Sequence, residues 1–144
     1  MQDPNCIFCK IIGGKIPARV VARNQNAIAI LDAFPLAAGH TLVMPKEHVV
    51  KVQDADRDQS SDIFELVGKV ATAIESGLGV QGSLVAVHNG PTAGQEVPHL
   101  HIHIIPRQQG DGAGPVHSMF KTRRKIEPSE MDSILDRIAS SAHQ

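Results

Sequence analysis

Tryptophan and tyrosine are absent from the chain, and only 4 phenylalanines occur among its 144 residues. Proteins that bind single-stranded nucleic acid without sequence preference stack bases on aromatic side chains, so this composition does not favour such a role. Basic residues number 14 and acidic residues 15, for a formal net charge of −1. A nearly neutral chain has no broad positive field to attract phosphate backbones. We therefore expect no nucleic-acid partner, and any nucleotide should be held by a local pocket.

Long apolar runs are also missing. No stretch approaches the ~20 apolar residues of a membrane-spanning helix, and the N-terminus lacks the charged-then-apolar pattern of a secretory signal. We therefore expect no membrane contact and a cytoplasmic protein. The length and the 42% hydrophobic content suit one ordinary domain with a hydrophobic core.

The composition changes after Arg107. Residues 108–115 are rich in glycine, which is typical of a linker. Pro128 and Ser129 then suit the start of a short helix that runs through Ile138. We expect a main domain over residues 1–110 and a C-terminal extension, with this short helix, over residues 111–144.

The only two cysteines, Cys6 and Cys9, form a C-x-x-C pair near the N-terminus. Such a pair can be a disulfide, a redox couple or half of a zinc site. A reducing cytosol disfavours the disulfide, and a thioredoxin-like couple would follow a strand in a βαβ unit. A zinc site needs two more ligands, for which His48 and His99 are available.

Three histidines alternate with aliphatic residues between His99 and Ile105. Alternate residues of an extended chain point to the same side, about 6.6 Å apart, so His99, His101 and His103 should share one face. A slip of one residue would bury all three imidazoles in the core. We therefore predict a strand whose imidazoles line an opening. The alternatives are a metal site and a solvated strand face.

The segment before these histidines, residues 89–98, is a polar loop that contains glycine and proline. Glycine and proline allow a tight path with close approach of the backbone to a ligand. Free backbone N–H groups beside imidazoles suit a phosphate.

The other expected elements follow from the spacing of apolar residues and from glycine and proline positions. They are a short helix near residues 7–13, a hairpin of residues 19–23 and 26–31, a strand at 40–45, a long helix at 59–78 and a strand at 83–87.

The stretch from Gly94 to Arg107 closely resembles the signature of the histidine triad (HIT) family of nucleotide hydrolases and transferases. Two more blocks support the resemblance, Phe8–Ile12 with Ile16-Pro17, and Leu31–His48. The resemblance implies an α+β HIT-like fold over residues 1–110. Such a fold has an antiparallel meander sheet, one long helix and a short N-terminal helix, and is usually paired into a homodimer.

The resemblance also implies roles for individual residues. His101 corresponds to the nucleophile that attacks the α-phosphorus and becomes nucleotidylated, and neutral imidazole suits that task. His40 and His103 correspond to imidazoles that fix its tautomer and assist proton transfer, and His99 completes the catalytic set. A structural zinc ion would be bound by Cys6, Cys9, His48 and His99. The implied substrate-binding residues are Asp32 for the ribose, Phe8, Ile11, Ile16 and Ile30 for the base, and His88, Asn89, Gly94, Gln95, Glu96 and Val97 near the phosphate.

Two residues depart from the family pattern. His88 stands where an Asn or Gln is usual, and Glu96 stands where one branch has Ser near the leaving group. The expected activity is hydrolysis of a purine nucleoside phosphoramidate such as an adenosine monophosphate (AMP) conjugate. The alternatives are a dinucleoside polyphosphate hydrolase and a non-catalytic nucleotide- or zinc-binding interaction protein.

Overall fold

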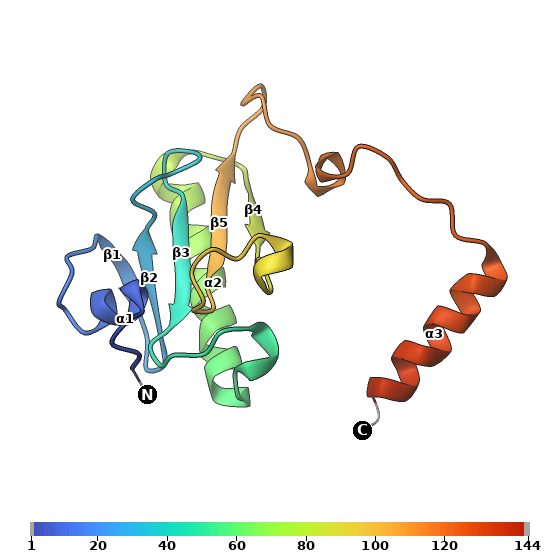
Figure 1. Ribbon diagram of the computed structural model, residues 1–144. Helices are drawn as coiled ribbons and strands as arrows, with labels where there is room; N and C mark the ends of the chain where they lie inside the picture. Colours follow the sequence, from blue (N-terminus) through green and yellow to red (C-terminus); the bar gives the residue numbers. More distant parts are fainter. Residues whose placement is uncertain (1, 143–144) are drawn as a thin grey trace. The chain divides into compact units, whose positions relative to one another are not determined.

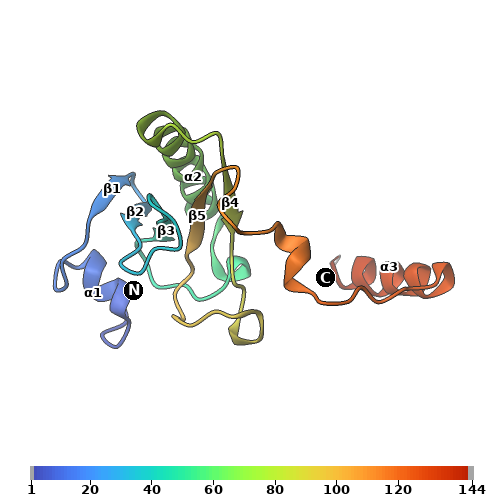
Figure 2. The ribbon, with the colours of Figure 1, turned by 90° about the horizontal axis from the view of Figure 1, so that it is seen from above.

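The computed structural model describes residues 2–142. Its contacts divide the chain into two units, one that ends at Asp111 and one that begins at Gly112. The first unit contains a five-stranded sheet with a helix on each face (Figures 1 and 2). Its strands are β1 (Val20–Arg23), β2 (Ala27–Leu31), β3 (Thr41–Pro45), β4 (Gly82–Ala86) and β5 (Ile102–Arg107).

The strands lie in the order β1-β2-β3-β5-β4, and every neighbouring pair is antiparallel. The α+β class is confirmed, but a simple meander is wrong for the last two strands, because β5 is inserted between β3 and β4. Since β3 and β4 are both antiparallel to β5, they run parallel to each other. Parallel strands need a long crossover, and helix α2 (Arg57–Leu78) provides it.

Helix α2 begins with a reciprocal cap. Asp56 accepts a hydrogen bond from the Gln59 amide, and the Gln59 side chain accepts one from the Asp56 amide (2.8 and 3.0 Å). The helix ends at Gly79, whose φ of +66° is a left-handed conformation that favours glycine. Its apolar face packs on one side of the sheet. The buried residues of this core are Ala27, Ala29, Val43, Ile63, Leu66, Val67, Val70, Ile74, Val80, Leu100, Ile102 and Ile104.

The opposite face of the sheet is covered by the short helix α1 (Ile7–Ile12). Strand β2 alternates between the two cores: its alanines face α2, while Ile28 and Ile30 face α1. Burial on both faces explains why β2 and β3 have almost continuous apolar sequences. The second core consists of Cys6, Phe8, Cys9, Ile28, Ile30, Leu42 and Met44.

Strand β5 is shorter at its start than the alternation of histidines predicts. The ladder begins at Ile102, because the Leu100 amide donates to the carbonyl of Val49 (2.7 Å) and leaves the sheet pattern. The aliphatic side of the prediction is correct, since Leu100, Ile102 and Ile104 are all buried against α2. The imidazoles upstream of the ladder are therefore free to diverge.

The second unit contains helix α3 (Pro128–Ala142), which extends beyond the expected end at Ile138. Short 3-10 turns occur at Val52–Asp54 and Pro91–Ala93 in the first unit and at Val116–Met119 in the second. Among residues 2–142, no helix has the length and apolarity needed to cross a membrane.

Candidate active site and metal-binding cluster

A cavity of about 870 Å³ opens on the face of the sheet that carries α1. Its apolar lining residues include Phe8, Ile11 and Ile30. The imidazoles of His101, just before β5, and of His103, within β5, line the same cavity. Concave apolar sites with a few polar groups are typical of small-molecule binding. The cavity is the candidate active site.

His101 is held in one tautomer by the main chain. Its Nδ1 lies 2.6 Å from the carbonyl oxygen of His99. A carbonyl only accepts, so Nδ1 carries the proton and Nε2 keeps its lone pair. Burial lowers the pKa of His101, and the ring is further enclosed by Phe8, whose centroid lies 5.1 Å away in an edge-on arrangement. In the neutral ring, Nε2 of His101 therefore carries the lone pair that a nucleophile needs.

His40 and His103 form a hydrogen-bonded relay beside the His101 ring. The amide of Leu36 donates to His40 Nδ1 (3.1 Å), so the proton of neutral His40 is on Nε2. That Nε2–H donates to His103 Nδ1 (2.9 Å), which places the proton of His103 on its own Nε2. Within residues 2–142 this buried Nε2 has no hydrogen-bond partner. His103 also lines the cavity, and its Nε2–H is left as a donor without a partner in the described chain.

The same relay includes a second group of possible metal ligands. One ligand atom each of Asp32, His40 and His103 lies within 4.8 Å of the others, as a bound cation would require. His40 Nε2 is 3.5 Å from an oxygen of Asp32, but it carries a proton and offers no lone pair. The other Asp32 oxygen accepts a hydrogen bond from the Phe34 amide (2.8 Å). We interpret the group as side chains that are held at the cavity wall by hydrogen bonds of fixed direction.

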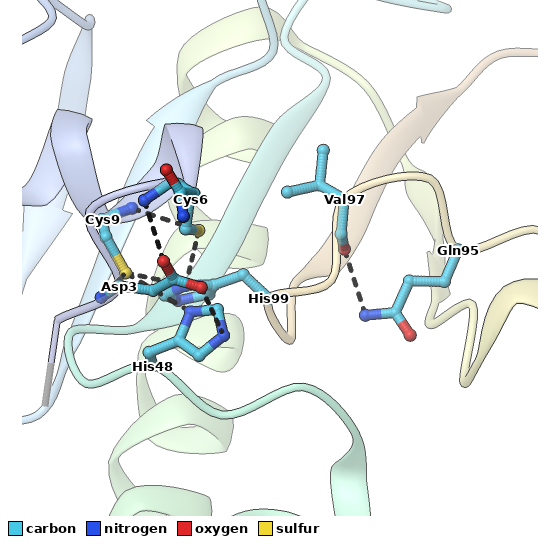
Figure 3. Close-up of polar contacts among 8 residues, drawn as sticks. Asp3, Cys6, Cys9, His48, Gln95, Val97 and His99 are labelled. Carbon is cyan, nitrogen blue, oxygen red and sulfur yellow. Dashed lines mark hydrogen bonds and ion pairs between the residues drawn. The ribbon is translucent and has the colours of Figure 1, made fainter.

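The thiols and two imidazoles predicted to bind zinc lie together beside α1 (Figure 3). His99 Nδ1 is 3.4 Å from Cys6 Sγ and 3.6 Å from Cys9 Sγ, and Cys9 Sγ is 3.4 Å from His48 Nδ1. Ligand atoms of a tetrahedral zinc ion are about 3.4–3.8 Å apart, given bond lengths of about 2.0–2.3 Å. The spacing of the four residues therefore fits Zn²⁺.

The protons around this cluster also suit a metal. His99 Nε2 is 2.9 Å from the carbonyl of Pro45, so Nε2 carries the proton and Nδ1 presents a lone pair to the sulfurs. The amide of Asp3 donates to Cys9 Sγ and the amide of Cys9 donates to Cys6 Sγ, each over 3.4 Å. Such donors stabilise thiolates. In the absence of a cation, burial raises the pKa of Cys9.

His99 does not share an opening with His101 and His103, contrary to the prediction from strand alternation. It is fully buried and faces the thiols, and it does not line the cavity. Its carbonyl oxygen, however, sets the tautomer of His101. Sequence analysis missed this role, because a main-chain contact leaves no signal in the residue type.

The predicted substrate-binding residues divide into two groups. Ile16, Asn89 and Gln95 do not line the cavity. Asn89 instead accepts from the Val52 amide and donates to Gln53 (3.0 and 2.9 Å). The predicted residues that do line the cavity are Phe8, Ile11, Ile30, Asp32, His88, Gly94, Glu96 and Val97.

Gln95 is buried, and its side chain fixes the loop of residues 89–98 by hydrogen bonds. Its side chain accepts from the Gly90 amide and donates to the carbonyls of Val50 and Val97 (2.9, 2.8 and 3.1 Å). The amides of Gly94 and Gln95 bond to carbonyls within the loop, so they are not the free donors that the sequence suggested.

Free amides occur one step further along the loop. Within the described chain, the amides of Glu96 and Val97 have no hydrogen-bond partner, and both residues line the cavity. Backbone N–H groups in this position suit a phosphate oxygen.

Further lining residues escaped the sequence analysis. Four of them come from the β2–β3 loop, where the apolar run Phe34-Pro35-Leu36 beside Asp32 was a usable signal. The missed residues are Ile7, Pro17, Ala18, Arg19, Leu31, Ala33, Phe34, Pro35, Leu36 and Leu42.

Comparison with known proteins shows similarity to a family and to a named enzyme. The HIT domain family matches residues 13–110. The adenosine 5'-monophosphoramidase of Schizosaccharomyces pombe is 38% identical over 137 residues, which cover 94% of this chain and 97% of that protein.

Solved structures agree. The crystal structure of a HIT family member from Bacillus subtilis has a TM-score of 0.84 at 40% identity and covers 94% of this chain and 96% of that one. A zinc-bound histidine triad protein from Mycobacterium smegmatis has a TM-score of 0.71 at 30% identity, over 95% and 97% of the two chains. With the signature histidines, the fold and the family match in agreement, the chain belongs to the histidine triad (HIT) family.

Proposed function

We propose that the protein hydrolyses purine nucleoside phosphoramidates, such as AMP conjugates of amines, through a covalent nucleotidyl-His101 intermediate. The observation that carries the proposal is the 2.6 Å contact between His101 Nδ1 and the His99 carbonyl, which leaves a lone pair on Nε2 in a residue that lines the cavity. The similarity to a named adenosine 5'-monophosphoramidase supports the choice of substrate. Members of the HIT family are nucleotide hydrolases and transferases.

Binding of the nucleoside would use the α1 end of the cavity. Phe8, Ile11 and Ile30 offer an apolar wall to a purine base. Asp32 has acceptor capacity left beyond its bond to the Phe34 amide, so it suits the ribose hydroxyls.

The reaction would consist of two displacements at the α-phosphorus. In the first, His101 Nε2 forms a bond to phosphorus, the P–N bond breaks, and the amine leaves with a proton taken from water. In the second, water attacks phosphorus, the N–P bond to His101 breaks, and AMP leaves as the proton of the water passes to solvent. Charge that develops on the phosphoryl oxygens would be stabilised by His103 Nε2–H and by the free amides of Glu96 and Val97.

We also propose one structural zinc ion per chain, bound by Cys6, Cys9, His48 and His99. The spacing of these atoms and the zinc-bound relative from Mycobacterium smegmatis support it. When bound, zinc would supply positive charge that stabilises the two thiolates. It would tie the N-terminal segment to His99 without entering the chemistry.

A homodimer is the remaining proposal. Strand β4 is an edge of the sheet, and Val85 on it is 43% exposed, which leaves an unpaired edge for association. Light scattering coupled to size exclusion tests it, because a monomeric mass at micromolar concentration would contradict the proposal.

A fluorogenic AMP phosphoramidate tests the activity directly. The native protein should release amine over many turnovers, and rapid quenching should trap an acid-labile AMP adduct on His101. Binding of AMP without turnover would favour the non-catalytic nucleotide-binding alternative. Faster cleavage of a dinucleoside polyphosphate than of the phosphoramidate would favour the other hydrolase.

A further inference from the structure

The cavity has two chemically different ends. A series of ring contacts leads across it: Phe8 to His101 at 5.1 Å, His101 to His103 at 5.1 Å, and His103 to His88 at 5.3 Å. Phe8 belongs to α1, while His88 follows β4. In both views α1 lies near β1 and β2, while β4 forms the far edge of the sheet (Figures 1 and 2). A nucleotide with its base at the Phe8 end and its phosphorus at His101 would direct its leaving group toward His88.

The fixed charges on the cavity wall are few and unevenly placed. Among the described residues, Arg19, Asp32 and Glu96 are the only lining residues with a full charge at neutral pH. The carbonyl of Arg19 accepts from the Leu31 amide (2.9 Å), so the backbone of Arg19 lies beside Asp32, at the nucleoside end.

Glu96 is the remaining lining residue with a full charge. It follows Gly94, whose φ of +98° and position against the His88 ring hold the loop close to that ring. Glu96 is exposed, and within residues 2–142 its carboxylate has no ion-pair partner. Lys51 packs near Gly90 but does not line the cavity.

We propose that this end of the cavity is a leaving-group subsite that selects amines carrying a second, positively charged group, with Glu96 as the counter-ion. The inference rests on the proposed function and names its substrate class. A polyphosphate leaving group would place several negative charges beside Glu96 with no cation on that wall, which disfavours it. An amine with a terminal ammonium meets an unpaired carboxylate instead.

Three AMP phosphoramidates of matched length test this selectivity. Their leaving groups are 1,4-diaminobutane, which ends in a cation, pentylamine, which is neutral, and 5-aminopentanoate, which ends in an anion. The native protein should show the highest kcat/KM for the cationic conjugate and the lowest for the anionic one. The preference should shrink as salt is added, because the pair is exposed.

Substitution of Glu96 identifies the counter-ion. Glu96→Gln should lower the ratio of kcat/KM for the cationic over the neutral conjugate by about two- to fivefold, the range of exposed charge pairs. Glu96→Lys should invert the order and favour the anionic conjugate. Glu75→Gln makes the same change in net charge on the exposed side of α2, outside the cavity, and should leave the ratio unchanged.

The outcomes separate this proposal from the previous one. Equal rates for all three conjugates in the native protein, or an unchanged cation preference in Glu96→Gln, would overturn the subsite while the hydrolase stands. Absence of turnover for every conjugate would overturn the hydrolase and the subsite together.

Discussion

His99 contacts the two centres of the protein through different atoms: its Nδ1 lies 3.4 Å from Cys6 Sγ, and its carbonyl oxygen lies 2.6 Å from His101 Nδ1. The side chain belongs to the proposed zinc cluster, and the main chain orients the proposed nucleophile. A disturbance of the thiols therefore has a short path to the active site.

Removal of the nucleophile should abolish turnover without abolishing binding. His101→Ala and His101→Gly should lower kcat by several powers of ten, because no other group forms the covalent bond. AMP affinity should change little, since Asp32 and the apolar wall are untouched. Steady-state kinetics and calorimetric titration with AMP measure the two effects. Retention of more than about a tenth of the native kcat would contradict the role, since loss of an essential nucleophile costs far more.

The thiol–imidazole cluster should bind one zinc ion per chain when the protein is purified without chelators. His48→Ala should lower the zinc content and reduce the free energy of unfolding by about 3 kcal/mol or more, because a lost structural metal is among the largest single-site effects. Elemental analysis and denaturant titration measure both. His117→Ala is the matched control, since His117 lies in the second unit outside the cluster. Native protein without metal, or equal zinc in both variants, would refute the site.

The free energy of unfolding should fall as the pH is lowered from about 6.5 to about 4, because the imidazole of His103 stays neutral in the folded protein over this range. Burial, with the neighbouring His101 and His40, lowers the pKa of His103 to about 4, whereas an unfolded histidine titrates near 6.5. Between these values the unfolded chain binds more protons, so its population grows as the pH falls from about 6.5 to about 4. The contribution is complete above about pH 6.5.

Replacement of His103 should make this dependence shallower. The slope from one such group is at most about 1.4 kcal/mol per pH unit. Denaturant titrations of native protein and His103→Asn at several pH values measure the difference, and His117→Asn is the control. Equal slopes for native protein and His103→Asn would show that His103 is not held neutral.

Gln95, whose side chain holds the loop before β5 through three hydrogen bonds, should matter for catalysis although it does not line the cavity. Gln95→Ala leaves the Gly90 amide and the carbonyls of Val50 and Val97 without their side-chain partner. We expect a loss of roughly 2–4 kcal/mol in the free energy of unfolding, because buried polar groups would lose hydrogen bonds. We also expect a fall in kcat of about tenfold or more as the Glu96 and Val97 amides lose their fixed positions.

The exposed Gln109 provides the comparison for that variant. Gln109→Ala should match the native protein in both chemical denaturation and turnover. If Gln95→Ala keeps the native kcat despite reduced stability, the loop amides do not depend on the Gln95 side chain.

Local sequence patterns predicted most elements because each rests on neighbouring residues. The spacing of Ile63, Leu66, Val70 and Ile74 specified the buried face of α2, and Gly79 its end. The strand order could not be predicted in this way. Insertion of β5 between β3 and β4 depends on pairings such as Val43 with Ile102, which join residues far apart in the chain.

In the candidate site, too, some features could be predicted from the sequence and others depend on contacts between distant residues. Signature residues such as Asp32 and Gly94 were found on the cavity wall, because their types and spacing match the family. Strand alternation alone could not predict the direction of His99, since the bond from the Leu100 amide to the Val49 carbonyl ends the ladder, and the preceding imidazole faces the thiols, as the resemblance implied.

The hydrogen bonds from the Leu36 amide through His40 to His103 all run in one direction. A main-chain amide can give a hydrogen bond but cannot take up a proton, so the order Leu36 to His40 to His103 has a fixed polarity. His103 Nε2 can thus offer a hydrogen to a bound molecule but cannot accept one while the ring is neutral. Molecules whose atom at that point is itself a hydrogen donor are disfavoured, because two donors would face each other. We therefore expect the cavity to favour ligands that present a hydrogen-bond acceptor to His103 Nε2.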